Sequence, residues 1–400
     1  MISLVGLSYC LVSLRFSFGQ VLLVGPVGAG WAPEALGERA KRRDGVRGRR
    51  CAHREGSGSM DARGNPRGVF AVRPHREVGD ADIDRTYVRV SAASVRPGAV
   101  LPFRVYKRVG QQALRLLAEE NTPIPDVPLT RGGVLGGAGD RFYVRAGQRQ
   151  AIVRYQETIL GEVLRDVNLA IDDKADLLQN QTTLLSQEMF ERPEAAQIAR
   201  QRNTIREMVD LVVREPEAIH GLLRLTHYDY YTYTHSVNVG IYALWLLAEH
   251  FRDKADLDVH ETATAYFLHD IGKCRVDPAI ISKPGKLTEA EWAEIRKHPD
   301  HGYAILMEEK HLTPETTTIV LQHHERMDGR GYPKGLKGEQ VHPYARVCGL
   351  VDAFDALTTR RSYKPALTHF EALKVMKDEM HLQFDPEIFK SFVLMCRRKK

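Results

Sequence analysis

Hydrophobic and polar residues alternate in three short runs in the first half of the chain. Tyr87–Val90, Phe103–Tyr106 and Phe142–Arg145 each show the period of two that is typical of a half-buried β-strand. Glycine-rich turns separate these runs, and residues 111–120 can form either a short strand or a short helix. The pattern predicts a small β or α+β domain over residues 84–150.

From Ala151 onward the apolar residues recur at spacings of three and four, which indicates helices with one buried face. A first helix is predicted over residues 152–171 and a second over residues 193–213. Together they form a connecting region, 151–215, that either covers a catalytic core or makes a dimer contact. The expected fold class is mainly α, as an all-helical bundle with the small β or α+β domain before it. The bundle domain, 216–400, is predicted to contain helices over 234–250, 257–271, 288–310, 314–325, 343–357, 367–379 and 386–398.

The first 80 residues show neither pattern. The chain carries 57 basic and 51 acidic residues, but between Arg39 and Arg76 there are 12 Lys or Arg against 3 acids. The net charge of +6 therefore belongs to a Gly/Arg-rich stretch, and a folded basic surface for nucleic acid is not predicted. Residues 1–80 are interpreted as unstructured, and residues 1–59 as an extension upstream of a true start at Met60.

The apolar content and the cysteines indicate in which cellular compartment the protein is expected. No run of 18 apolar residues exists, so neither a signal peptide nor a stable membrane insertion is expected. The five cysteines are widely spaced without a CxxC pair, which argues against a disulfide framework or a zinc ribbon. This cysteine usage fits a reducing cytoplasm.

Histidine and aspartate residues recur through the helical half at intervals of 25 to 34 residues. Each interval is about one helix, one loop and one helix, so side chains of successive antiparallel helices can converge at one level of a bundle. The pair His269-Asp270 ends an apolar run, and burying such residues is costly unless they are paired or metal-bound. The candidate ligands are His235, His269, Asp270, His298, His323, His324 and Asp352.

These residue types are those of a binuclear metal site. Imidazole and carboxylate ligands suit Fe or Mn, and also Ni, Co or Zn, while the lack of Cys ligands argues against structural zinc. Five histidines and two aspartates are too many for one ion and suit two divalent transition-metal ions, which together lower the pKa of a bridging water. Asp270 is the expected bridge between one ion held by His235, His269 and Asp352 and a second held by His298, His323 and His324.

Several motifs carry a family resemblance. Leu268–Lys273 resembles the HD signature of the HD phosphohydrolase superfamily, and His323–Pro333 resembles the signature of its HD-GYP subgroup. Val351–Thr358 and Arg361–Pro365 are similar to further HD-GYP motifs, in the same order. The resemblance covers roughly residues 220–400. It implies an all-helical HD fold, a bi- or trinuclear metal centre, and hydrolysis of cyclic di-GMP to pGpG or GMP.

The resemblance gives roles to residues beyond the ligands. Asp270 and Lys273 are the expected catalytic pair, since Lys273 lies one turn on and can reach a phosphate or leaving oxygen; a salt bridge to a carboxylate is the alternative. Arg361 and Lys364 match residues that contact substrate phosphate, with a solvated basic turn as the alternative. Asp355 is grouped with the substrate-binding residues, and can orient a ligand histidine or pair with Arg361 instead.

The glycine-rich loop after His324 holds Tyr332, which is expected to contact substrate. In the family this loop braces the site and engages signalling partners, so Gly329–Pro333 is a candidate protein contact. Some members hold a third metal through a Glu four residues before the first histidine. That position is Tyr231 here, so two metals are predicted.

Three functions remain open at this point. The leading one is a metal-dependent phosphodiesterase for cyclic di-GMP. The alternatives are an HD phosphohydrolase acting on another cyclic dinucleotide or nucleotide, and a non-catalytic nucleotide sensor. A homodimer through the connecting helices is compatible with each of them.

Overall fold

The computed structural model describes residues 86–109, 113–125, 141–226, 232–251, 257–283, 285–360 and 365–398. The expectations for residues 1–80 lie outside the described residues. Between residues 86 and 398 the fold is mainly helical with one small sheet, which confirms the predicted fold class.

The sheet has four strands in the order β1-β4-β2-β3, and each neighbouring pair is antiparallel. Two of the predicted strands have the expected bounds, and the ambiguous segment 111–120 contributes a strand rather than a helix. Phe103 and Phe142 lie in one buried cluster with Ile152 and Leu185, so the two following helices cover a face of the sheet. The strands are β1 (Tyr87–Val90), β2 (Val105–Val109), β3 (Ala113–Ala118) and β4 (Phe142–Arg145).

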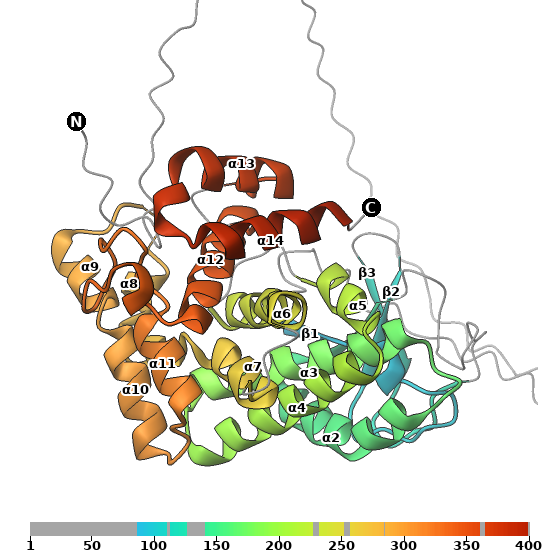
Figure 1. Cartoon of the computed structure of the whole chain (residues 1–400). Helices are drawn as coiled ribbons and strands as arrows, with labels where there is room; N and C mark the ends of the chain where they lie inside the picture. The colour runs from blue at the N-terminus through green and yellow to red at the C-terminus, as the bar shows by residue number, and fades with distance from the viewer. Residues whose placement is uncertain are drawn as a thin grey trace, which may run out of the picture. The chain divides into compact units, whose positions relative to one another are not determined.

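Helices account for most of the remaining described residues (Figure 1). The long ones before the bundle are α2 (Arg149–Arg165), α3 (Ile171–Glu191) and α4 (Ala195–Arg214). The bundle helices are α5 (Ala218–Arg224), α6 (Thr232–His250), α7 (Val259–Leu268), α8 (Pro278–Ile281), α9 (Glu289–Ile295), α10 (His298–Glu308), α11 (Pro314–Gln322), α12 (Pro343–Thr358), α13 (His369–Glu379) and α14 (Pro386–Arg398). Short 3₁₀ turns are η2 (Ala92–Ser94), η3 (Ala146–Gln148), η4 (Ile271–Arg275), η5 (Gly338–Gln340) and η6 (His381–Gln383).

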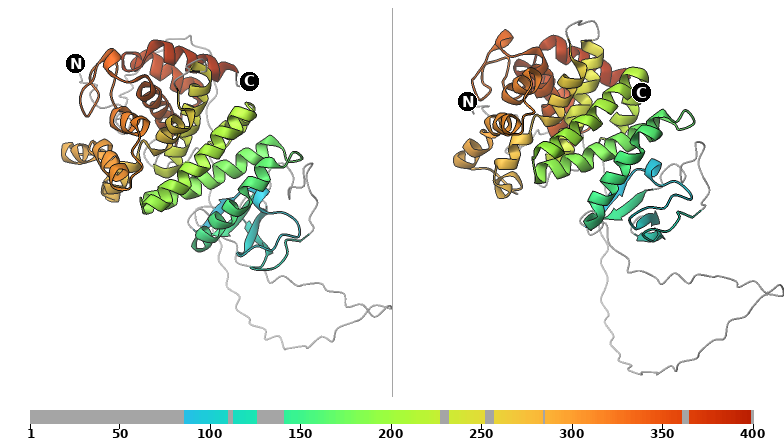
Figure 2. Two further views of the ribbon diagram at one scale, coloured as in Figure 1. Left: turned by 60° about the horizontal axis from the view of Figure 1, so that its bottom comes forward. Right: turned by 90° about the horizontal axis from the view of Figure 1, so that it is seen from below.

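Helix α6 is the central element of the bundle. Its residues from Thr234 to Leu247 are all buried, as expected for a helix that is apolar on every side. Helices α7 and α12 pack against it, and α3 packs against α6 while α4 packs against α7. Figure 1 shows α6 end-on among these neighbours, and both views of Figure 2 show the green helices α3 and α4 side by side. The long helices therefore cover the bundle core. Among the described helices, none is long and apolar enough to cross a bilayer.

The predicted helix over 152–171 is wrong beyond Arg165. Helix α2 ends there, and the Asp166 side chain accepts a hydrogen bond from the Asn168 backbone N–H at 2.9 Å, which forms a turn. Val167 continues the apolar spacing by coincidence, because it is 90% exposed. Ile171 begins α3 instead.

The predicted helix over 288–310 is two helices, α9 and α10, which meet at Lys297. Pro299 lies in the first turn of α10, where its missing N–H costs nothing, whereas inside a continuous helix it would clash with the preceding turn. The break makes His298 the first residue of α10. Likewise α7 ends at Leu268, so the predicted helix over 257–271 stops before His269 and Asp270.

Candidate metal centre

The seven predicted ligands converge in the interior of the bundle. Each is at most 2% exposed. His235 and Asp352 lie within the buried helices α6 and α12, whereas the other five lie at helix ends. Helix ends deliver these side chains because the chain turns there and the side chain points beyond the helix. His269 and Asp270 lie between α7 and η4, His298 opens α10, and His323 and His324 follow α11.

The ligand atoms form two clusters, in each of which they lie within 4.8 Å of one another. Asp270 faces both clusters through different oxygens. Its Oδ1 is 3.3 Å from His298 Nε2, and its Oδ2 is 3.4 Å from His269 Nε2 and 3.6 Å from His235 Nε2. One carboxylate can thus serve two cations, which is the arrangement expected from the sequence. The clusters are Asp270, His298, His323 and His324, and His235, His269 and Asp352.

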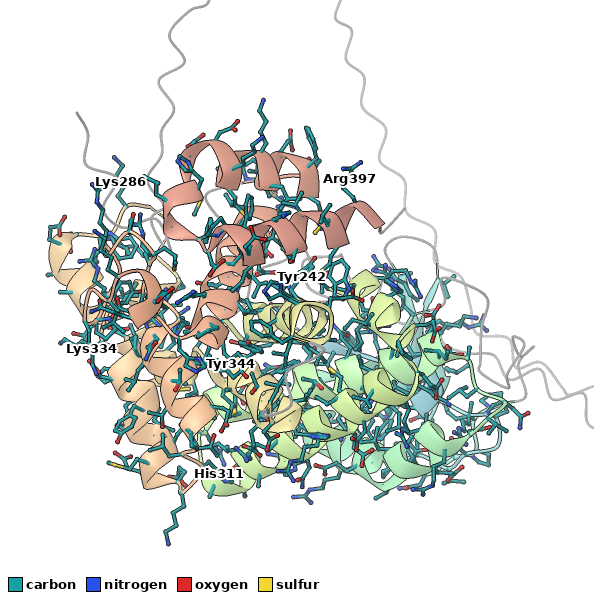
Figure 3. The ribbon with its side chains drawn as sticks, viewed as in Figure 1. Tyr242, Lys286, His311, Lys334, Tyr344 and Arg397 are labelled. Carbon is teal, nitrogen blue, oxygen red and sulfur yellow. The ribbon has the colours of Figure 1, made fainter. Side chains whose placement is uncertain are left out.

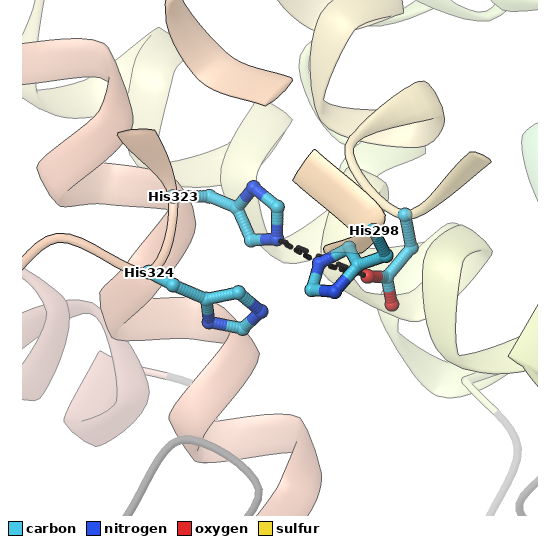
Figure 4. A group of neighbouring side chains, drawn as sticks. His298, His323 and His324 are labelled. Atoms are coloured by element: carbon cyan, nitrogen blue, oxygen red, sulfur yellow. Dashed lines mark hydrogen bonds and ion pairs between the residues drawn. The ribbon is translucent and has the colours of Figure 1, made fainter. Parts of the chain in front are cut away.

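Backbone carbonyls fix the orientation of three histidines. The Nδ1 atoms of His269, His298 and His323 lie 2.7, 2.8 and 3.0 Å from a carbonyl oxygen one turn earlier. A carbonyl only accepts, so each Nδ1 carries the proton and each Nε2 presents a lone pair. The Nε2 atoms of His298 and His323 are 3.1 Å apart, so two lone pairs face each other (Figure 4). A cation between them would relieve that repulsion, and the donor set therefore fits a metal.

His235 is held by a carboxylate instead. Its Nδ1 lies 2.7 Å from Asp355 Oδ2, while Asp355 Oδ1 accepts a hydrogen bond from Asn238 Nδ2 at 3.0 Å. On the other side of the ring, Nε2 lies 3.0 Å from Asp352 Oδ1. Asp355 is 1% exposed and both its oxygens are engaged, which favours the alternative role of orienting His235, while its grouping with the substrate-binding residues stays a prediction.

Burial and neighbouring charges set the protonation of the centre. Burial lowers the pKa of His323 to about 4 and the pKa values of His298 and His324 well below their ordinary value. Burial would raise the pKa of Asp270, but the surrounding imidazoles, His269 first, outweigh it and hold that pKa well below its usual range. Burial would lower the pKa of His269, but the neighbouring Asp270 carboxylate outweighs it and raises that pKa. Metal ions bind neutral imidazole and ionised carboxylate, so a metal ion at His269 competes with a proton.

Lys273 is almost fully buried, at 4% exposure, and forms an ion pair with Asp270 Oδ2. The salt bridge considered as the alternative for this residue is therefore present. It also holds the ammonium group next to the carboxylate that faces both clusters, so a contact with substrate remains a prediction.

The glycine-rich loop packs directly on a predicted ligand. The Tyr332 ring stacks on the His324 ring with centroids 4.6 Å apart and planes inclined by 26°, and the Tyr332 N–H donates to His324 O at 3.2 Å. A Cβ at Gly331 would lie 2.5 Å from His324 O, so only glycine allows this approach. Tyr332 thus restrains His324, whereas its predicted contact with substrate is untested.

Glu325 anchors the same loop and was missed by the sequence reasoning. It is 6% exposed and accepts hydrogen bonds from the backbone N–H groups of Lys334 at 2.7 Å and Leu336 at 2.8 Å. The available signal was its position, because this acidic residue directly follows two predicted ligands and precedes the glycine-rich loop. Arg361, Lys364 and Tyr231 lie outside the described residues.

Comparison with known proteins places this centre in a family context. Residues 237–388 match the family described as HD domain. A cyclic di-GMP phosphodiesterase of Pseudomonas aeruginosa is 38% identical over 50% of this chain and 48% of its own length. The 3'3'-cGAMP-specific phosphodiesterase 3 of Vibrio cholerae is 38% identical over 40% of this chain and 34% of its own. The chain thus spans about half or less of these curated relatives.

A solved structure supports the fold. An HDG"Y"P protein from Bdellovibrio bacteriovorus matches 78% of this chain and 99% of its own, with a TM-score of 0.57 and 18% identity. At that identity the likeness concerns the fold alone.

Proposed function

We propose that this chain, whose residues 237–388 match the family described as HD domain, is a metal-dependent phosphodiesterase that hydrolyses cyclic di-GMP. The products are pGpG and, after a second cleavage, GMP. The observation that carries the proposal is the buried pair of ligand clusters with Asp270 facing both of them. A two-metal arrangement of this kind is typical of phosphate ester hydrolysis.

The proposed metals are two divalent transition-metal ions, with Fe or Mn favoured and Ni, Co or Zn as alternatives. When bound, such ions supply an activated water and neutralise charge on the phosphate. His298, His323 and His324 would hold one ion and His235, His269 and Asp352 the other, with Asp270 shared. Tyr231, in place of the Glu that some members use, supports two ions rather than three.

The chain's own residues then have distinct tasks. Lys273, held by Asp270, is proposed to donate hydrogen bonds to the phosphate or leaving oxygen. Arg361 and Lys364 are proposed to bind substrate phosphate, on the strength of their motif. Tyr332 stacks on His324 and is proposed to contact substrate as well.

The relatives leave two substrates to distinguish, because one is named for cyclic di-GMP and the other for 3'3'-cGAMP. We favour cyclic di-GMP, since that relative matches more of this chain. The mixed dinucleotide is the second candidate. A non-catalytic sensor is disfavoured because all seven ligands are present and buried.

The test is to offer metal-loaded protein a panel of cyclic di-GMP, 3'3'-cGAMP and cyclic di-AMP, and to measure kcat/KM for each. We expect cyclic di-GMP to be hydrolysed best, and Asp270→Ala to abolish metal binding and turnover together. Asp378→Ala, an exposed aspartate on α13, is the matched control. Preference for 3'3'-cGAMP would favour the second candidate, and no turnover of any dinucleotide by protein with two bound metals would favour a sensor.

We also propose a protein contact through the loop Gly329–Pro333. Pro333 and Lys334 are exposed beside the centre, and Figure 3 shows Lys334 at the periphery. A homodimer remains a prediction without a specific contact behind it. The reducing cytoplasm remains the proposed compartment, because the thiols of Cys274 and Cys348 form no disulfide.

A further inference from the structure

Arg296 lies between two aromatic rings beside the metal centre. Its guanidinium carbon is 5.9 Å from the centroid of the Trp292 ring and 5.7 Å from that of the Tyr332 ring. Tyr332 in turn stacks on His324, and Arg296 itself stands two residues before His298. The cation is therefore linked to two predicted metal ligands, to one through a stacked ring and to the other through the backbone.

The charge of Arg296 has no carboxylate counterpart among the residues that the structure describes. The charged residues near it in the sequence do have ion-pair partners. Lys297 Nζ lies 2.6 Å from Glu294 Oε2, and Glu291 is paired with Lys283. The Arg296 side chain is partly buried, and its guanidinium group lies over both rings. Contacts with ring faces hold the guanidinium plane in position but use none of its five N–H donors. The donors thus remain available for a ligand with several oxygen acceptors.

We propose that Arg296 binds the second phosphate of the cyclic dinucleotide, the one that is not being cleaved. This inference rests on the proposed function. A cyclic dinucleotide carries two phosphodiester groups in one ring, and only one of them can occupy the metal centre at a time. The other is a singly charged anion with two non-bridging oxygens, and an arginine fork can bind it through two parallel hydrogen bonds.

The aromatic neighbours strengthen this role. Trp292 is 8% exposed and Tyr332 is held by His324, so the two rings fix the guanidinium with little freedom. A cation that is already ordered loses less entropy when it binds its ligand. Arg296 comes from the junction of α9 and α10, whereas Arg361 and Lys364 follow α12. The second phosphate would therefore be held from a different element of the fold.

The experiment compares two substrates in the metal-loaded full chain. Cyclic di-GMP has a second phosphate, and bis(p-nitrophenyl) phosphate has only the diester that is cleaved. For Arg296→Ala we expect KM for cyclic di-GMP to rise about 10- to 100-fold, the range for losing hydrogen bonds to a charged group. Its kcat should stay within about threefold, and hydrolysis of bis(p-nitrophenyl) phosphate should be unchanged.

Two further variants sharpen the test. Arg296→Lys keeps the charge but loses the fork, so its KM should lie between those of Arg296→Ala and the unaltered chain. Lys297→Ala removes the adjacent, exposed charge and should leave KM for both substrates unchanged. The thermal midpoint of each variant shows whether the fold is intact.

Three results would overturn the inference. If KM for cyclic di-GMP does not change in Arg296→Ala, the residue does not bind substrate, while the proposed function stands. If turnover of both substrates falls by the same factor, Arg296 only supports Tyr332 and His324. If the unaltered chain cleaves bis(p-nitrophenyl) phosphate but no cyclic dinucleotide, the proposed function and this inference fail together.

Discussion

The five histidines of the centre are held in place by three kinds of partner. Backbone carbonyls hold His269, His298 and His323, the Asp355 carboxylate holds His235, and an aromatic ring covers His324. A carboxylate behind an imidazole raises its basicity as a ligand, whereas a carbonyl mainly fixes the tautomer. The two clusters therefore differ in how their ligands are tuned.

Asp355→Ala should weaken metal binding at the cluster of His235 about 10- to 100-fold, the usual cost of losing such a partner. The cluster of His298 has no contact with Asp355 and should keep its affinity. Calorimetric titration of metal-free protein would show one weakened phase and one unchanged phase. Two unchanged phases would mean that Asp355 does not position His235. Asp378→Ala is the control.

Lys273→Met tests the other carboxylate contact. The bound cations would compensate the charge of Asp270, so metal content should be retained. Loss of the ammonium group near the phosphate should lower kcat about 100-fold, as for other donors that stabilise developing charge. Metal analysis and steady-state kinetics on one sample check both statements, and an intact kcat would show that Lys273 is structural.

Among single residues, the sequence predicted which side chains converge, because each is a chemically distinctive residue beside a recognisable motif. Glu325, Asn238 and Arg296 were missed. Glu325 binds backbone amides of the loop, Asn238 binds the carboxylate of Asp355 on α12, and Arg296 lies over the Tyr332 ring. No pattern along the chain marks contacts made by tertiary folding.

Among the elements, η4 and α10 approach each other closely at a glycine. A Cβ at Gly272 would lie 1.8 Å from the carbonyl oxygen of His298 and 2.4 Å from the Gly302 nitrogen. The two backbones touch there, and this contact brings Asp270 and His298 to the same level. Glycine is required because no side chain fits between them.

Gly272→Ala should force η4 from α10, separate the clusters and reduce the free energy of unfolding by about 3 kcal/mol or more. Metal binding should be lost with it. Gly161→Ala is the matched control, because its Cβ would meet only the flexible end of Arg165. That change inside α2 should stabilise the protein by up to ~1 kcal/mol. Urea unfolding of both variants gives their free energies of unfolding. Equal values for Gly272→Ala and Gly161→Ala would contradict the close approach of the two backbones at Gly272.

Helix α14 begins with a charged cap. Asp385 Oδ1 accepts from the N–H groups of Glu387 and Ile388 at 3.0 and 3.2 Å, and Oδ2 pairs with Arg346 at 2.8 Å. Burial would raise the pKa of Asp385, but the bond from Arg346 and these N–H groups outweigh it and lower that pKa. Its stabilisation is therefore fully present above the unfolded pKa of about 4 and is lost as pH falls through the folded value.

Asp385→Ala should cost ~1–2 kcal/mol of unfolding free energy at pH 7. The deficit should narrow as the pH falls below about 4, because the carboxyl of the unaltered chain becomes protonated. Asp385→Asn keeps the cap and loses the ion pair, so it should cost less. Urea titrations at several pH values test this, and a deficit independent of pH would exclude the charge as its cause.

Helix bounds were predicted where apolar periodicity and breakers agree, as for α12 and α14. The proline at 299 marked the start of α10 but was outweighed by the periodicity around it. Helix α3 was missed for another reason. Its buried face includes Gln179, Asn180 and Ser186, so apolar spacing alone cannot find it.

Over the whole molecule, the centre joins segments far apart in the chain. Its ligands run from His235 on α6 to Asp352 on α12. Helices α3 and α7 pack against α6, and α4 packs against α3 and α7. The sequence predicted this helical domain, the small sheet and the two clusters. It could not predict which helices lie side by side, since that depends on packing.

In the proposed active site two metal ions act together, and Asp270 is shared between them. The most direct measurement is turnover of cyclic di-GMP as metal-free protein is titrated with Mn²⁺ or, without oxygen, Fe²⁺, with bound metal counted at each point. Turnover should appear with the second ion and should be complete at two ions per chain. Full activity at one ion per chain, a requirement for three, or two tightly bound ions with no turnover would contradict it.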